Sequence, residues 1–190
     1  MQNSAEVVYR LNERDEVCYV NPQYDAFAEA NEGAHVESRV VLHRSLWDFV
    51  TDSTTQQLYR DAIRRARAGR RVRFRFRCDS PTSRRLMEMD VACVSAGCVE
   101  FRVRTLLQEP RTSQPLLDPR AKHTTDILRM CGWCKKVRVG NAWVEVEAAV
   151  EHLRLFEHSS LPLLTHGICD ECYRAAMASL EDSDNASSRN

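Results

Sequence analysis

The sequence has no long apolar run, and this absence argues against a membrane-spanning helix. Its 190 residues contain no stretch close to the ~18 consecutive apolar residues that such a helix needs. The sequence also lacks an excess of charge of either sign, because 27 basic and 27 acidic residues give a net charge of zero. Attraction of the whole molecule to nucleic acid or to an anionic membrane is therefore not expected, and any such binding has to be local.

A secretory signal peptide is also missing from the polar start Met1-Gln2-Asn3-Ser4. We therefore expect a cytoplasmic protein in a reducing environment. Disulfide bonds between its eight cysteines are not expected in that compartment.

Known catalytic signatures are absent as well. The sequence has no phosphate-binding glycine loop, no kinase signature and no Ser-His-Asp constellation. His35-Val36-Glu37 matches half of the zinc deaminase signature, but no proline precedes either Cys-x-x-Cys pair. We expect a protein that is not an enzyme.

What the sequence does have is two Cys-x-x-Cys knuckles. Cys131 and Cys134 enclose Gly-Trp, Cys169 and Cys172 enclose Asp-Glu, and the 34 residues from 135 to 168 separate the pairs. A two-residue gap lets both thiolates of a knuckle bind one ion, and two knuckles supply the four ligands of a tetrahedral Zn²⁺ at about 2.3 Å each. The spacing predicts a structural zinc site.

Two further interpretations of this region stay open. Lys135 and Lys136 follow Cys134 and favour its thiolate, which a reactive redox pair also needs. His166 lies three residues before Cys169. This histidine either hydrogen-bonds to a metal ligand or replaces one cysteine as a ligand.

Composition predicts two folded units joined by a linker. Pro110, Pro115 and Pro119 lie among polar residues, which is typical of an extended connection. The end of the chain has no large apolar residue, which favours disorder. The expected boundaries are a first unit over 5–107, a linker over 108–117, a second unit over 118–180 and a disordered tail over 181–190.

Hydrophobic periodicity predicts the elements of the first unit. Alternation indicates strands near 7–11 and 17–20, and Asn21-Pro22 indicates the start of a helix. A longer helix from about 53 to 68 ends at Gly69, with the inward stripe Leu58, Ala62, Ile63 and Ala66. Alternating residues over 72–78, 87–93 and 99–103 then indicate a three-stranded meander.

This pattern resembles a PAS domain over roughly residues 5–107. The matching runs are Tyr19-Val20-Asn21-Pro22, Ser45-Leu46-Trp47-Asp48-Phe49, the helix ending at Gly69 and the meander after it. The resemblance implies an α+β fold with a five-stranded antiparallel sheet and helices on one face. It also implies a sensory or dimerisation role, and a pocket that holds an unknown ligand or is filled by side chains.

Residue types limit what that implied pocket can hold. The flavin-binding subclass uses a cysteine in an Asn-Cys-Arg-Phe-Leu-Gln run, which this sequence lacks. Haem would need an axial ligand such as His35 or His43. The candidate pocket residues are His43, Trp47, Phe76, Cys78, Met87 and Met89. For the cysteine and the methionines, an ordinary position in the core is the simpler interpretation.

The second unit is predicted to combine the knuckles with helices and a hairpin. Asp118-Pro119 indicates a helix toward Met130, and Gly140-Asn141 indicates the tip of a hairpin. A helix with an apolar stripe follows over 145–156, and a last helix begins near Cys169–Cys172.

Knuckle, hairpin and ligand-bearing helix resemble a treble-clef zinc module. The runs at 130–137, 143–147 and 165–172 are similar to a C-terminal module of bacterial PAS-containing and response-regulator-like signalling proteins. This resemblance implies a small zinc-binding α+β module whose biochemical role is not defined. About 60 residues bury little surface, so we expect the metal to supply folding energy.

Nine arginines between Arg60 and Arg77 form the one concentrated charge. They could bind an anionic partner, but no nucleic-acid motif accompanies them and Asp61, Glu88 and Asp90 offset part of the charge. Nucleic-acid binding is therefore the weaker interpretation.

Taken together, these patterns favour a cytoplasmic signalling protein. A PAS-like sensor or dimerisation domain, able to form a homodimer, is coupled to a structural-zinc module that contacts a partner protein. No membrane partner is expected. The alternatives are a thiol/zinc redox switch and a nucleic-acid-binding regulator that uses the Arg60–Arg77 face.

Overall fold

The computed structural model describes residues 6–31, 33–118 and 120–187, which form two compact units. The first comprises Met1–Arg75, Met87–Thr105 and Arg174–Asn190, and the second comprises Phe76–Leu86 and Leu106–Tyr173. The chain passes between the units inside β3 (Val72–Arg77), β4 (Ser83–Ser95), β5 (Cys98–Pro110) and the first turn of α5 (Asp170–Ser187). The expected linker over 108–117 therefore begins inside the strand β5. Instead of one boundary in an extended segment, the chain passes from one unit to the other at four places.

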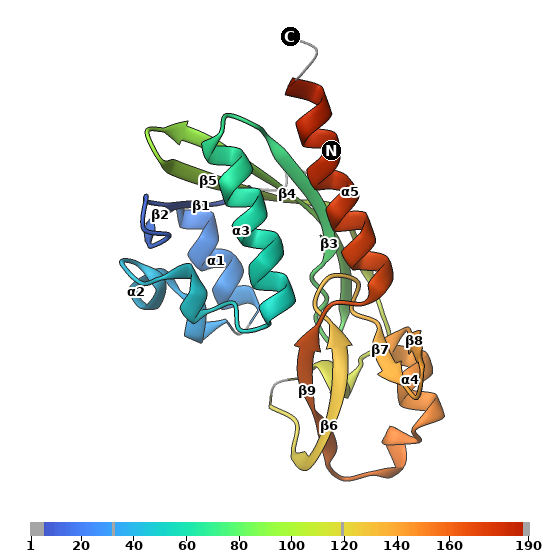
Figure 1. The fold of residues 1–190 in the computed structure, drawn as a ribbon. Helices are drawn as coiled ribbons and strands as arrows, with labels where there is room; N and C mark the ends of the chain where they lie inside the picture. The colour runs from blue at the N-terminus through green and yellow to red at the C-terminus, as the bar shows by residue number, and fades with distance from the viewer. Residues whose placement is uncertain (1–5, 32, 119, 188–190) are drawn as a thin grey trace. The chain divides into compact units, whose positions relative to one another are not determined.

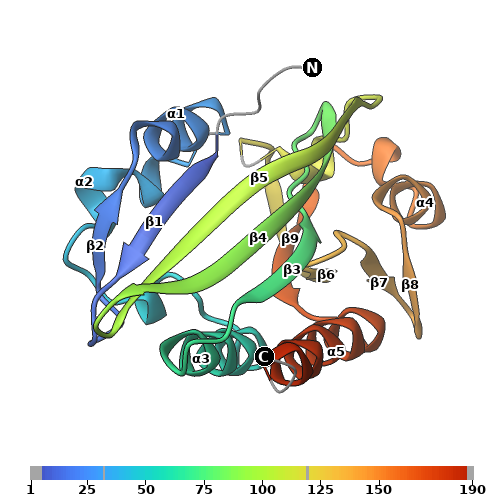
Figure 2. The ribbon, with the colours of Figure 1, turned by 90° about the horizontal axis from the view of Figure 1, so that it is seen from above.

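A five-stranded sheet in the order β2-β1-β5-β4-β3 builds the first unit (Figures 1 and 2). β1 (Val7–Leu11) runs antiparallel to both β2 (Val17–Val20) and β5. The predicted pair of N-terminal strands and the C-terminal meander are confirmed. The fold is thus α+β with an antiparallel sheet, as the residue periodicity indicates.

Local sequence signals explain the helices of this unit. α1 (Pro22–Ala30) begins after Asn21, whose side-chain oxygen accepts a hydrogen bond from the Tyr24 N–H. A 3-10 turn η1 (Ala34–Val36), the short α2 (Ser38–Val41) and η2 (Leu46–Asp48) follow. α3 (Ser53–Arg67) buries the predicted stripe Leu58, Ala62, Ile63 and Ala66 and is followed by Gly69 at φ +80°.

The core of the first unit is aromatic and aliphatic. Phe101 is fully buried and stacks on Tyr9 with ring centroids 4.6 Å apart, and Tyr59 stacks at 6.0 Å. Met87 and Met89 are 2% and 3% exposed and belong to the same core. Burial raises the pKa of Tyr59 to about 12, so its phenol stays neutral.

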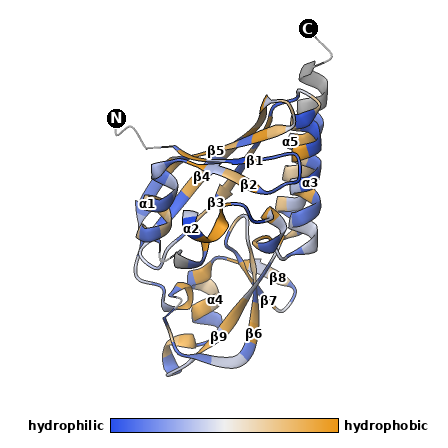
Figure 3. Ribbon diagram, turned by 90° about the vertical axis from the view of Figure 1, so that its left-hand side faces the viewer, coloured by the Kyte–Doolittle hydropathy of each residue, from blue (hydrophilic) through white to orange (hydrophobic). Residues whose placement is uncertain are grey.

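A second, four-stranded sheet in the order β8-β7-β6-β9 builds the second unit. β7 (Val137–Val139) and β8 (Ala142–Val144) form the predicted hairpin, with Gly140 at φ +59° in its turn. α4 (Val146–His152) follows, and Figure 3 shows hydrophobic residues along α4, β6 and β9. Leu116, Met130, Val137, Val146 and Val150 are among the residues of this core.

The predicted helix from Asp118 toward Met130 is wrong. Residues His123–Cys131 form the strand β6, which pairs in parallel with β9 (Leu161–Gly167). The β-branched Thr124, Thr125 and Ile127 favour a strand. Pro119, on which the helix prediction depended, lies outside the described residues.

Two other segments differ from expectation. The helix predicted over 145–156 ends with α4 at His152, because Arg154 takes a left-handed conformation (φ 51°) before the short turn η4 (Leu155–Glu157). α5 continues through Ser187, where a disordered tail was expected over 181–190, and residues 188–190 lie outside the described part. Among the described residues, no helix is long and apolar enough to cross a membrane.

Candidate metal centre

Parallel pairing of β6 with β9 brings the two knuckles together. Neighbouring parallel strands end at the same edge of a sheet, and Cys131, the last residue of β6, lies in register with Gly167, the last residue of β9. Cys169 follows two residues later, and α5 then carries Cys172 in its first turn. Cys131 thus ends β6, and Cys134 lies in the turn after it. Figure 1 shows β6 and β9 side by side, with α5 following β9.

The first knuckle is a tight turn between β6 and β7. The Cys131 N–H donates to the Lys136 carbonyl oxygen at 2.8 Å, and the Lys135 N–H donates to the Cys131 carbonyl oxygen at 2.9 Å. Lys135 holds a left-handed φ of 61° to close this turn. The Gly132 N–H donates to the Gly167 carbonyl oxygen at 2.8 Å, which ties the first knuckle to the strand that leads into the second.

The four sulfur atoms lie within 4.8 Å of one another, so that they could hold a metal ion. A tetrahedron with metal–sulfur bonds of 2.3 Å has sulfur–sulfur edges of about 3.8 Å. The Sγ atoms of Cys134 and Cys169 are 3.8 Å apart. Cys131 and Cys169 are buried, and Cys134 and Cys172 are partly exposed. The cluster has the size and donor set of a tetrahedral metal site.

Backbone N–H groups point at the sulfur atoms. The Cys169 N–H donates to Cys131 Sγ and the Cys172 N–H donates to Cys169 Sγ, both at 3.4 Å. Such bonds stabilise thiolates, which are the form that binds metal. Hydrogen bonds from Cys134 and Cys172 lower the pKa of Cys131, and the same sharing raises the pKa of Cys134 to about 12.

A buried ionic network holds the first knuckle from the side of the β3–β4 segment. The Arg77 N–H donates to the Trp133 carbonyl oxygen at 2.6 Å, between two of the ligands. The Arg77 guanidinium binds Asp79 and, at 2.7 Å, Glu145. Arg111, whose side chain is 3% exposed, binds Asp79 at 3.0 Å. Its second contact is with Glu147, at 2.6 Å.

Ion pairs in this network offset the effect of burial on the pKa of Arg77. Desolvation lowers the pKa of Arg77, but its bonds to Asp79 and Glu145 raise the pKa by more, and the net shift is upward. The spacing of the cysteines gives no sign of this network. The sequence signal that was available is Asp79, close behind the run of arginines that ends at Arg77.

His166, predicted either to hydrogen-bond to a metal ligand or to replace one, is not in the cluster. The group of possible ligand atoms among the described residues contains the four cysteines and no histidine. His166 is exposed on β9, in register with Met130. Lys136 lies near the site instead and forms an ion pair of 3.5 Å with Glu171.

The candidate pocket residues of the first unit have separate positions. His43 is exposed at φ 63°, and the Trp47 ring lies under the Arg60 guanidinium at 3.9 Å while its Nε1 donates to Asp15. Met87 and Met89 are core residues. Phe76 and Cys78 belong to the second unit. His35, the other histidine considered for haem, is exposed in η1.

Several arginines between Arg60 and Arg77 form ion pairs with acidic side chains. Arg73 and Arg75 bind Glu88, which is 2% exposed, and Arg73 also binds Asp90 at 3.1 Å. Arg67 binds Asp15 at 2.8 Å. These side chains form ion pairs within their own unit, which weakens the case for a free anion-binding face.

No protein-family model matches the chain, and no curated protein matches it in sequence. A domain of an HTR-like protein from Haloarcula marismortui ATCC 43049 is similar in structure, with 12% sequence identity and a TM-score of 0.37. The match covers 54% of this chain and 98% of that domain. Similarity at this level carries no argument about function, which has to come from the site itself.

Proposed function

We propose that Cys131, Cys134, Cys169 and Cys172 hold a structural Zn²⁺ and that the chain is a non-enzymatic signalling protein. In this proposal the first unit is a PAS-like sensor or dimerisation domain. The second unit is a zinc module that presents a surface to a partner protein. The thiolates have to stay reduced, so the proposal places the protein in a reducing compartment such as the cytoplasm.

The observation that carries the proposal is the set of four sulfur atoms within 4.8 Å. Sulfur-only tetrahedral sites select zinc or iron, and zinc is the ion of small structural modules. Four thiolates fill the coordination shell and leave no open position for water or substrate, which supports a structural role over a catalytic one. The antiparallel five-stranded sheet with its helices supports the PAS-like assignment.

Elemental analysis tests the metal assignment directly. Protein purified under reducing conditions without added metal is expected to contain one zinc per chain. Native mass spectrometry of the same sample reports subunit number and any bound small molecule. A protein without metal, or one with iron and its visible absorption, would contradict the zinc proposal.

A thiol/zinc redox switch is the second candidate, favoured by the partial exposure of Cys134 and Cys172. Hydrogen peroxide would oxidise two thiolates to one disulfide and be reduced to water, with two protons consumed, and the ion would lose two ligands. Zinc release that follows thiol loss at mild peroxide doses supports this candidate. Full zinc retention at doses that oxidise other cysteines argues against it.

A further inference from the structure

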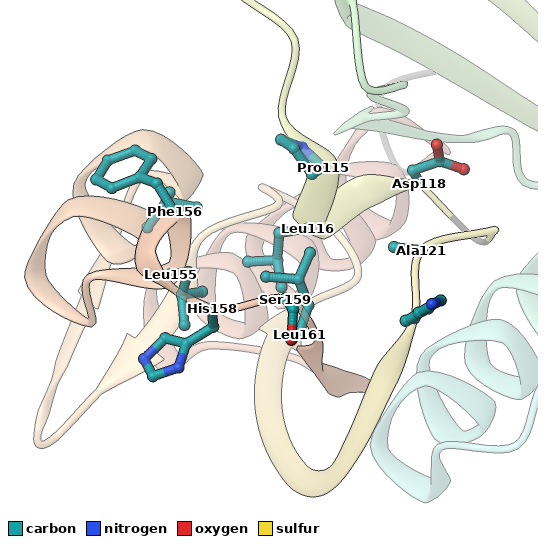
Figure 4. A pocket seen from close by; sticks show the side chains of 11 residues that line it. Pro115, Leu116, Asp118, Ala121, Leu155, Phe156, His158, Ser159 and Leu161 are labelled. Atoms are coloured by element: carbon teal, nitrogen blue, oxygen red, sulfur yellow. The ribbon is translucent and has the colours of Figure 1, made fainter.

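The second unit contains a cavity that the metal centre does not use. It has a volume of about 480 Å³, within the range of about 300–1,000 Å³ that is typical of small-molecule sites. η3 (Pro115–Leu117), the end of α4 with η4, and the start of β9 line it (Figure 4). The Leu161 N–H donates to the Lys122 carbonyl oxygen at 2.7 Å and joins two of these segments.

The floor of the cavity is aliphatic. Leu116, Val150, Leu155 and Leu161 line it and are between 2% and 8% exposed. Figure 4 shows Leu116, Leu155 and Leu161 close together, with Asp118 and His158 on opposite sides. These residues belong to the core of the unit, so the floor is rigid and offers only apolar contact.

The mouth of the cavity is polar and carries unused positive charge. Lys122, His158 and Ser159 line it and are exposed, and the Lys122 and His158 side chains have no hydrogen-bond or ion-pair partner among the described residues. Asp118 is the acidic residue of the lining, and its carboxylate already accepts from Arg120, through the backbone N–H and Nε. The charge left to attract a ligand is therefore positive.

The backbone at the mouth holds an aromatic ring out in solvent. Arg154 takes a left-handed conformation at φ 51°, and the turn after it buries Leu155 while Phe156 stays 73% exposed. Strained backbone of this kind is retained where the surrounding structure requires it, often near binding sites. An exposed Phe beside an apolar cavity offers contact area to a bound molecule.

We propose that this cavity binds a small apolar carboxylate. The hydrocarbon part contacts the aliphatic floor and Phe156, and the carboxylate faces Lys122 and His158. The site lies in the second unit, which also carries the four cysteines, and would give that unit a ligand response of its own. The proposal goes beyond the zinc assignment and needs only a folded second unit.

The test uses butanoate, hexanoate and octanoate with the full-length, metal-loaded protein. Binding is followed by chemical-shift changes of backbone N–H groups, and each added methylene is expected to tighten Kd about fourfold until the cavity is full. Shift changes are expected around Leu116, Val150 and Leu161. Octylammonium, with a matched chain and opposite charge, is expected to bind more weakly than octanoate.

Variants then separate the contribution of the ligand's carboxylate from that of its hydrocarbon chain. Lys122→Glu is expected to weaken octanoate by up to about fivefold, as an exposed ion pair allows, and to leave octan-1-ol unchanged. Ala121→Phe should fill the cavity and abolish binding of both. Arg138→Glu, an exposed charge change on β7, is the matched control and should change neither. If Ala121→Phe loses its metal, this variant is not folded correctly, and the test then depends on Lys122→Glu, whose side chain is exposed.

Metal content and circular dichroism of every sample show whether the second unit is folded. A folded, metal-loaded protein that gives no saturable octanoate binding overturns the proposal, as does equal binding of octylammonium. A protein without zinc that still binds octanoate contradicts the metal assignment and leaves this inference standing.

Discussion

The backbone N–H of Arg77 donates a hydrogen bond of 2.6 Å to the carbonyl oxygen of Trp133. Arg77 ends β3, and Trp133 lies between Cys131 and Cys134. A residue more than fifty positions before Cys131 therefore supports the knuckle, together with the buried Asp79 and the partly exposed Glu145. The second unit is built from two separate parts of the chain.

Replacement of a ligand should remove the metal. Loss of a residue that only hydrogen-bonds to a metal ligand typically lowers metal affinity about 10–100-fold. Cys169→Ser is expected to lower zinc affinity by more than this, because it removes a buried ligand itself. His166→Ala should keep one zinc per chain, since the cluster contains no histidine. Zinc content by elemental analysis checks both, with Cys93→Ser as a control outside the cluster. Zinc loss in His166→Ala would show that this histidine is a ligand.

Loss of Asp79 should destabilise the second unit. Asp79→Ala leaves the buried Arg111 and the largely buried Arg77 without a shared carboxylate, and removal of one partner of a buried pair costs about 3–5 kcal/mol. Urea unfolding with saturating zinc measures the change. Glu157→Ala removes a carboxylate from an exposed pair in the same unit and is expected to cost less than about 1 kcal/mol. Equal effects of the two variants would contradict the role given to the network.

The stability of the first unit should depend on the ionisation of Glu88. Burial raises the pKa of Glu88, but hydrogen bonds from Arg104 and Arg75 lower it by more, so the pKa in the folded state lies below its ordinary value. A carboxylate with a lowered pKa stabilises the folded state above the unfolded pKa of about 4.3 and loses this contribution as the pH falls through the folded pKa.

Glu88→Gln is therefore expected to cost about 1–3 kcal/mol at pH 7. The difference from the parent protein should shrink as the pH falls from the unfolded pKa of about 4.3 toward the lower pKa that Glu88 has in the folded state. Denaturant unfolding across pH 3–7 measures this difference, with the exposed Glu29→Gln as control. A cost that stays constant over the whole range would show that Glu88 acts through packing and not through charge.

Asn21 should contribute to stability through three hydrogen bonds. Its side-chain oxygen accepts from the N–H groups of Val8 and Tyr24, and its Nδ2 donates to the Glu6 carbonyl oxygen. Asn21→Ala is expected to lower the free energy of unfolding by about 1–2 kcal/mol, because it removes the N-cap of α1 and the tie to β1. Thermal unfolding checks this value, and the exposed Gln57→Ala on α3 should change little.

Local signals in the sequence predicted a large part of the first unit. Asn21 and Gly69 mark the ends of helices by chemistry that acts within a few residues, and the stripe from Leu58 to Ala66 follows the helical period. The four cysteines were also predicted, because the two-residue gap of each knuckle is itself a local geometric requirement.

Non-local pairing explains what the sequence did not predict. β6 was assigned to a helix because Asp118-Pro119 looks like a helix start, whereas the strand depends on its partner β9. The passage of β3, β4 and β5 between units has no compositional sign either, because Asp79-Ser80-Pro81-Thr82 looks like an ordinary turn between two strands of one sheet. The prolines after residue 108 therefore led to a wrong position for the boundary between the two units.

The parallel arrangement of β6 and β9 has a consequence for the order of folding. The hairpin, α4 and η4 lie between these strands, so this whole crossover has to close before Cys131 and Cys169 can meet. Contacts between residues this far apart in sequence form slowly, because the entropy of loop closure is lost before they stabilise the chain. If the proposed zinc site forms, coordination by all four thiolates therefore comes late in folding, and the four thiols stay open to competing metals and oxidants until then.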